Sequence, residues 1–177
     1  MNKKQKLKMY PYGYVYCGKR TVLIWQTGEM DTFRKTPWNG LLQSQSSTAM
    51  KRTLKSNAAK VRWSEYSEMD FDRFWKVLRN LKTGRASSII TCTILLDGWN
   101  FIEDMGRTFS LKKDLKRLHS RLLNKAYDKL FYGCNLPAVT PGGKSYSPLW
   151  SHEEILSMRA ELRKIWRTFR KQRYIQP

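Results

Sequence analysis

Apolar residues recur at helical spacing in three parts of the chain. Between Phe71 and Leu81 they follow one another at three- and four-residue steps, which places them on one face of a helix. The same spacing predicts a long helix over 110–132 and a last helix over 151–173, and basic residues occupy the remaining faces of both. The sequence therefore predicts one central helix and two long amphipathic helices with cationic polar sides.

Near the amino terminus the pattern changes to β-branched and aromatic residues, which favour strands. Residues 10–16 and 21–25 flank a glycine-containing turn at Cys17-Gly18, a pattern typical of a β hairpin. Residues 30–33 follow a second turn and are expected to add a short third strand.

The segment 87–96 is almost wholly apolar and ends at a turn dipeptide, which predicts a central strand covered on both faces. The expected fold is therefore α+β: an N-terminal β hairpin or meander, a central helix–strand pair and two long basic amphipathic helices. Residues 1–9 are expected to form a flexible basic arm and residues 10–177 a single domain. Within that domain, 134–150 is either a loop or a boundary before the C-terminal helix.

Two features narrow the class of protein. No run of 18 apolar residues occurs, so we expect no membrane span. The three cysteines, Cys17, Cys92 and Cys134, are far apart and odd in number, which excludes a disulfide framework and a CxxC-type zinc site. We therefore expect an intracellular protein in a reducing compartment, the cytoplasm or, in a eukaryote, the nucleus.

Charge is the most unusual property of the chain. Lys and Arg number 34 against 14 Asp and Glu, so the formal net charge is +20. It is unevenly distributed: net +10 over residues 1–60, −1 over 61–105 and +11 over 106–177. Because both end regions carry a large positive charge, their residues repel one another, and a polyanionic partner relieves that repulsion. We therefore expect the partner to be nucleic acid, either RNA or DNA.

The residues expected to contact phosphate are the bases of the arm, the hairpin turn and the two long helices. Each phosphate that such a residue neutralises releases condensed counterions, so a row of them can dominate affinity without reading sequence. The candidates are Lys3, Lys4, Lys6, Lys8, Lys19, Arg20, Lys112, Lys113, Lys116, Arg117, Arg121, Lys125, Arg159, Arg163, Lys164, Arg167, Arg170 and Lys171.

Aromatic residues are interleaved with bases in the hairpin. Tyrosines at alternate positions from 10 to 16 point to one face of a strand. Such a row either stacks unpaired bases or packs in the core beneath the sheet, and both interpretations stay open here. The candidates for base stacking are Tyr12, Tyr14, Tyr16, Trp25 and Trp38.

Carboxylates in the neutral middle of the chain suggest an alternative chemistry. Asp97 follows the predicted central strand, and Glu103 or Asp104 can return to it, so the three form a low-ranked set of catalytic candidates. Carboxylates placed this way can hold Mg²⁺ against a phosphate and promote its hydrolysis. The two histidines lie far apart, and we expect no other metal site or cofactor.

The strings Ile-Ile-Thr-Cys-Thr-Ile-Leu over 89–95 and Ser-Leu-Lys-Lys-Asp-Leu-Lys-Arg-Leu over 110–118 bear on the same alternative. A Thr-rich apolar strand before a basic helix resembles the rolling-circle replication initiators. That resemblance implies cleavage of phosphodiester bonds. The chain lacks that family's His-hydrophobic-His metal motif and no tyrosine matches its nucleophile, so no site residue is carried over.

The sequence thus favours a nucleic-acid-binding protein without enzymatic activity and with weak sequence specificity, acting alone or within a replication or ribonucleoprotein assembly. Two alternatives stay open. One is a metal-dependent nuclease or replication-initiator-like enzyme that requires Mg²⁺. The other is an interaction or inhibitor protein that binds an acidic protein surface.

Overall fold

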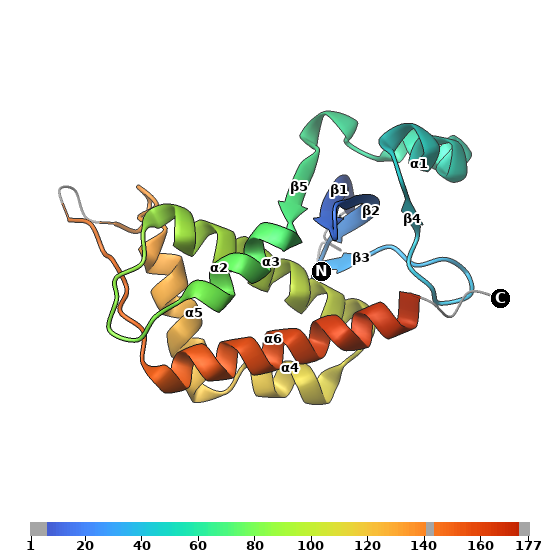
Figure 1. The fold of residues 1–177 in the computed structure, drawn as a ribbon. Coiled ribbons are helices and arrows are strands. Elements are labelled where there is room, and N and C mark those ends of the chain that lie inside the picture. Colours follow the sequence, from blue (N-terminus) through green and yellow to red (C-terminus); the bar gives the residue numbers. More distant parts are fainter. Residues whose placement is uncertain (1–6, 141–143, 174–177) are drawn as a thin grey trace, which may run out of the picture.

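A computed structural model of the chain describes residues 7–140 and 144–173. It contains a five-stranded sheet that stands on a body of helices (Figure 1), which confirms the predicted α+β class. The elements are β1 (Lys8–Tyr16), β2 (Lys19–Thr27), β3 (Thr32–Phe33), β4 (Gln43–Ser44), α1 (Ser47–Leu54), η1 (Lys55–Lys60), η2 (Trp63–Glu65), β5 (Ser67–Asp70), α2 (Phe71–Asn80), α3 (Ile89–Thr108), α4 (Lys112–Leu118), α5 (Arg121–Gly133) and α6 (His152–Arg173).

The sheet has the order β3-β2-β1-β5, with β4 paired to β2. Strands β1 and β2 form the predicted hairpin, whose two-residue turn places Cys17 at φ 52° and Gly18 at φ 68°. The predicted third strand is present as β3. The arm expected over 1–9 is wrong at its end, because Lys8 and the buried Met9 already belong to β1. Lys3, Lys4 and Lys6 lie outside the described residues.

The central strand predicted over 87–96 is wrong: residues 89–96 of this segment belong to α3, a helix of 20 residues. Ser88 caps it, its Oγ accepting a hydrogen bond from the Thr91 N–H at 3.2 Å. The buried residues recur at helical spacing, and α2, α5 and α6 all pack against this helix. A short apolar run fits a buried helix and a buried strand equally well, and here the surrounding helices decide for the helix.

The dipeptide Asp97-Gly98, expected to be a turn, lies in the middle of α3. Gly98 is buried, and a Cβ added there would clash with the ring of Phe74 on α2. The glycine therefore lets two helices approach closely rather than ending a strand. Without the strand, the resemblance to rolling-circle initiators loses the element on which it depended.

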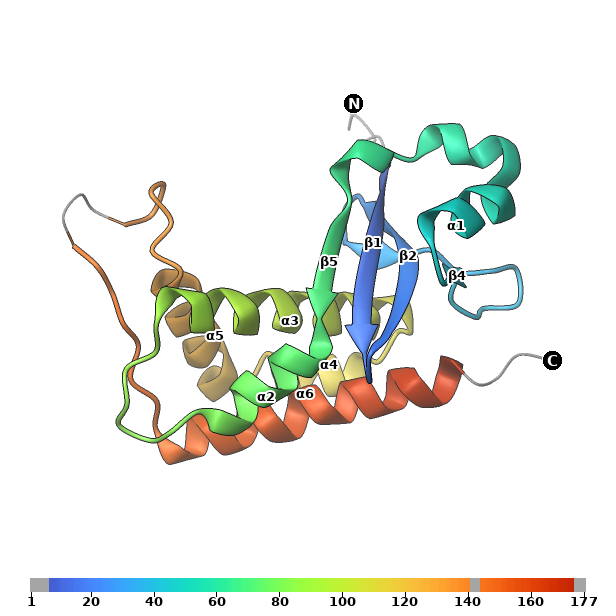
Figure 2. The ribbon, with the colours of Figure 1, turned by 45° about the horizontal axis from the view of Figure 1, so that its top comes forward.

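The single helix predicted over 110–132 is also wrong, because the structure divides it into α4 and α5. The break falls at His119 and Ser120, and the Ser120 Oγ accepts a hydrogen bond from the Leu123 N–H to cap α5. As Figures 1 and 2 show, α4 lies beside α6 whereas α5 runs across it. The basic residues of the predicted helix are therefore divided between α4 and α5, whose axes point in different directions.

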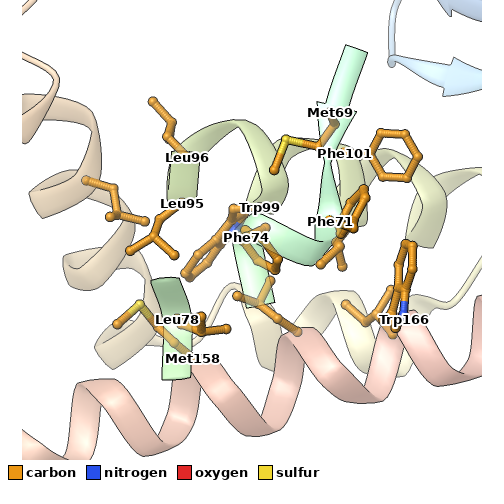
Figure 3. Packing of buried hydrophobic residues seen from close by; sticks show 14 of the residues in the cluster. Met69, Phe71, Phe74, Leu78, Leu95, Leu96, Trp99, Phe101, Met158 and Trp166 are labelled. Atoms are coloured by element: carbon orange, nitrogen blue, oxygen red, sulfur yellow. The ribbon is translucent and has the colours of Figure 1, made fainter. Parts of the chain in front are cut away.

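The core has two parts, one on each face of the sheet. The larger lies between the sheet and α2, α3 and α6, where the Phe71 and Trp166 rings stack at 4.3 Å between centroids (Figure 3). The smaller lies under α1 and includes Val22 and Ile24, which alternate along β2 with Leu23 of the larger part. The alternation fixes the order of layers as α1, sheet and helical body.

The predicted last helix is confirmed as α6, and its apolar stripe is buried as expected. The segment 134–150 is closed on itself by hydrogen bonds that Asn135 exchanges with the backbone of Tyr146. Its end is attached to the helical body, since Trp150 is buried and Lys129 of α5 donates to the Leu149 carbonyl at 2.9 Å. Within the described ranges, no helix has the length and apolar character needed to cross a bilayer.

Candidate nucleic-acid interface

Helix α6 presents a row of cations to solvent. Its apolar stripe, which includes Met158, Leu162 and Ile165, packs against the helical body and fixes which side faces outward. The opposite side carries a shallow groove of about 730 Å³ that runs along the helix. Arg159 also lines the groove but donates to carbonyl groups at the end of α2. We call the other basic residues of the groove the basic strip: Arg163, Lys164, Arg167 and Lys171.

Three members of the basic strip are not neutralised by the protein itself. Arg163, Arg167 and Lys171 form no ion pair within the described part of the chain. Lys164 is paired, with its Nζ 3.3 Å from the Asp114 carboxylate of α4. The strip therefore keeps most of its positive charge available for a ligand.

Helix α4 adjoins the strip through charged contacts. Besides the Asp114–Lys164 pair, Arg117 of α4 lies 3.3 Å from Glu161 of α6 and also pairs with Asp114. Burial raises the pKa of the Asp114 carboxyl, but the hydrogen bonds and charges of Arg117 and Lys164 outweigh it and hold this pKa below its ordinary value. The acid stays charged and holds the two basic helix faces together.

A pocket of about 420 Å³ opens where the hairpin tip meets α2 and α6. In Figure 2 the tip of the hairpin comes down onto α6. Four arginines and three aromatic rings dominate the lining of this hairpin-tip pocket. Its residues are Tyr16, Cys17, Asp72, Trp75, Arg79, Arg163, Trp166, Arg167 and Arg170.

The contacts inside the hairpin-tip pocket order its walls. The Arg170 guanidinium lies 4.8 Å from the centroid of the Tyr16 ring and donates a hydrogen bond to its hydroxyl at 3.2 Å. The Tyr16 ring in turn packs edge-on against Trp166 at 5.2 Å. The Asp72 carboxylate accepts hydrogen bonds from the backbone N–H groups of Cys17 and Gly18 at 2.8 and 2.9 Å, which fixes the hairpin turn to α2.

Arg163 and Arg167 belong to both the hairpin-tip pocket and the groove of the basic strip. The two features are therefore one continuous surface, which we call the basic face. Two basic residues that sequence reasoning did not connect lie on it together, Arg79 from α2 and Arg170 from α6. Guanidinium groups gathered in this way present several forked donors, the arrangement that binds phosphate oxygens most strongly.

Some predicted phosphate contacts have structural partners instead. Arg159 donates to the carbonyl oxygens of Leu78, Arg79 and Leu81 at 2.7 to 3.1 Å, so it caps the end of α2. Arg20 pairs with Glu68 across the sheet at 2.7 Å. Both residues therefore have partners within the fold, and their contact with phosphate stays a prediction.

The remaining candidates are distributed more widely. Lys19 is exposed at the hairpin turn, close to the pocket, whereas Lys8 is exposed at the opposite end of β1. Lys112, Lys113 and Lys116 are exposed on α4, and Arg121 and Lys125 on α5. None of these residues lines the hairpin-tip pocket or the groove on α6, so their contact with phosphate stays a prediction.

The tyrosines of β1 do share one face, and that face packs against the helical body. Tyr14 is 1% exposed and contacts Phe71 and Trp166, so the prediction that it stacks bases is wrong. Tyr12 packs against Phe101 at 5.5 Å. Only Tyr16, at the tip, borders the pocket, and there it meets an aromatic residue that the sequence did not single out, Trp75.

The two tryptophan candidates have different surroundings. The indole Nε1 of Trp25 donates to the Asp104 carboxylate at 3.0 Å, so this ring belongs to an internal network. Trp38 is 79% exposed on the loop between β3 and β4. It remains a candidate for stacking, outside the hairpin-tip pocket.

The carboxylates of the nuclease alternative lie elsewhere, on α3. Glu103 and Asp104 border a separate cleft of about 520 Å³, and both pair with Arg107, at 2.7 Å in the case of Asp104. Glu103 also lies 3.1 Å from His119 Nε2. Asp97 is exposed and does not line this cleft, so the structure does not bring the three predicted catalytic residues into one site. Among the residues described, no group of three His, Cys, Asp or Glu is arranged to hold a metal ion.

Burial raises the pKa of Asp104 to about 7, although its hydrogen bond from Trp25 and the charge of Arg107 both act to lower it. Asp31, across the cleft, adds a smaller upward contribution. The network around Asp104 joins β2 to α3, so its protonation affects the stability of the fold.

Comparison with protein families, curated proteins and solved structures yields no match for this chain.

Proposed function

We propose that this protein binds nucleic acid by seating phosphates along the basic face. The chain carries a formal net charge of +20, and the basic face concentrates part of it on a surface with few acids. A cationic groove with arginine forks attracts a phosphate backbone and holds it without reading bases.

One observation carries the proposal. Arg163, Arg167 and Lys171 lie on successive turns of α6, they project to the same side, and no acid among the described residues neutralises them. A cationic row left unpaired by its own protein repels itself, and that repulsion is relieved by a linear polyanion. Because the contacts are to phosphate, we expect weak sequence specificity and no requirement for a cofactor.

The salt dependence of binding tests the proposal. On duplex DNA of arbitrary sequence, about six to ten phosphate contacts give a slope of log affinity against log salt of about −5 to −9. Fluorescence anisotropy of labelled DNA over a series of salt concentrations measures this slope. A slope near −1, or the same affinity for an uncharged polymer, contradicts the proposal.

We propose nucleic acid as the partner, either RNA or DNA, whether the protein acts alone or within a larger assembly, because the unpaired cations of α6 form a row that matches a linear polyphosphate. An acidic protein that binds a few surface charges should show a much shallower salt dependence than DNA when it is titrated in the same salt series.

A further inference from the structure

The hairpin-tip pocket differs from the rest of the basic face because it combines guanidinium groups with aromatic rings. Among the described residues that line it there is no lysine, and four arginines accompany one carboxylate, Asp72. That carboxylate is already bound by two backbone N–H groups of the hairpin turn. Arg79, Arg163 and Arg167 form no ion pair among the residues that the structure describes, so the pocket offers these three guanidinium groups to an external anion.

The aromatic part of the pocket lies between the arginines. Trp166 forms its floor, 4% exposed and stacked on Phe71, so it is held rigidly. Trp75 stands beside it on α2, with ring centroids 6.1 Å apart, and is only partly buried. The partly buried Trp75 ring beside this rigid floor gives one flat ligand an aromatic surface to stack against.

We infer that the hairpin-tip pocket takes one unpaired nucleotide, with its phosphate on the arginines and its base against the aromatic wall. This inference rests on the proposed function and names its substrate class as single-stranded nucleic acid. A volume of about 420 Å³ suits a group of that size, and a base within a duplex cannot enter because its faces are covered by its neighbours. The α6 strip would then hold the phosphates on either side.

The test compares oligothymidylate with a duplex of equal length, using anisotropy for affinity and tryptophan fluorescence for contact. We expect about tenfold tighter binding of the single strand, with quenching of the tryptophan emission. Trp75→Leu should remove about tenfold of the single-strand affinity and leave duplex binding unchanged, and Trp75→Phe should retain most of it. Trp63→Phe, at the far end of the hairpin, is the matched control and should change neither.

Competition with small ligands separates a nucleotide site from a general anion site. Thymidine 5′-monophosphate should displace the oligonucleotide at concentrations where thymidine or inorganic phosphate does not. If Trp75→Leu does not fold, Arg79→Ala, an exposed change on the same rim, should lose this preference for the monophosphate.

The results distinguish the two proposals. Equal affinity for the two strand forms, with a steep salt slope and no effect of Trp75→Leu, overturns the nucleotide pocket and leaves the basic face standing. Equal competition by inorganic phosphate and the monophosphate likewise overturns the pocket. Absence of binding to either form at low salt overturns the proposed function and with it the pocket.

Discussion

Replacing Arg163, Arg167 and Lys171 together by alanine is expected to weaken binding to nucleic acid about a hundredfold at physiological salt. Three lost phosphate contacts reduce the magnitude of the slope of log affinity against log salt by about 2 to 3. The affinities of variant and wild type converge at about 1 M salt, so this difference in slope gives a loss of about a hundredfold at physiological salt. All three side chains project from α6 without ion pairs in the described part of the chain, so the folded state should keep its thermal stability.

The chain offers a charge-matched control for this variant. Arg52, Lys55 and Lys60 are exposed on α1 and η1, at the opposite end of the molecule from α6 in Figure 2. Replacing these three by alanine removes the same charge, from +20 to +17. We expect less than about threefold weaker binding from this control, because these sites are distant from the basic face and the effect of distant charges is screened. Similar losses from both triple variants would mean that net charge alone, and not the basic face, determines affinity.

Asp104→Asn is expected to stabilise the protein at pH 8 relative to the wild type. The pKa of Asp104 is about 7 in the folded state and lies near 3.9 in an unfolded chain, so the native protein binds the extra proton between these values. Stability therefore falls as pH rises toward 7. Between pH 5 and pH 8 the ionisation of Asp104 lowers the free energy of unfolding by about 2 to 3 kcal/mol. An asparagine does not ionise and causes no such fall. Asparagine keeps an acceptor for the indole N–H of Trp25.

Urea unfolding of both proteins at several pH values measures this effect. Glu103 and His119 face the same cleft, so the informative quantity is the difference between variant and wild type at each pH. That difference should be smallest below about pH 4, where both states hold the proton, and should grow by about 2 to 3 kcal/mol between pH 5 and pH 8. Asp128→Asn, on the exposed side of α5, is the control. A variant less stable than wild type throughout would show that the ion pair with Arg107 outweighs the cost of burial.

Local sequence features were sufficient to predict the hairpin, α2 and α6. The turn at Cys17-Gly18 permits the positive φ values that a two-residue hairpin loop requires, and α6 has an uninterrupted apolar stripe. Elements with one clearly apolar face identify their own type, because only one period fits the pattern.

The segment that became α3 had no such contrast between faces. Nearly all of residues 89–96 are apolar or β-branched, so their pattern does not reveal the period, and their composition favours a strand. The helix is decided by packing against α2, α5 and α6, contacts that connect distant parts of the sequence. The same absence of contrast made Gly98 look like a turn residue.

The sequence was sufficient to predict one part of the candidate site, the cations of α6, and not the part that α2 contributes. The cations of α6 were identifiable because they lie outside its apolar stripe. Arg79 and Trp75 were not, because they lie in a region of net charge −1 and reach the basic face only through the docking of α2 on α6. Arg159 shows the converse, since its role as a cap for α2 depends on carbonyl groups about 80 residues away in sequence.

Lysine footprinting with and without bound nucleic acid tests most directly whether phosphates occupy the basic face. Acetylation followed by mass spectrometry reports the reactivity of each lysine on the unmodified protein. We expect Lys164 and Lys171 to be protected by the ligand, while Lys51, Lys55 and Lys60, equally exposed on α1 and η1, remain reactive. Uniform protection of all five, or protection of the α1 lysines alone, would contradict the placement of the interface on α6.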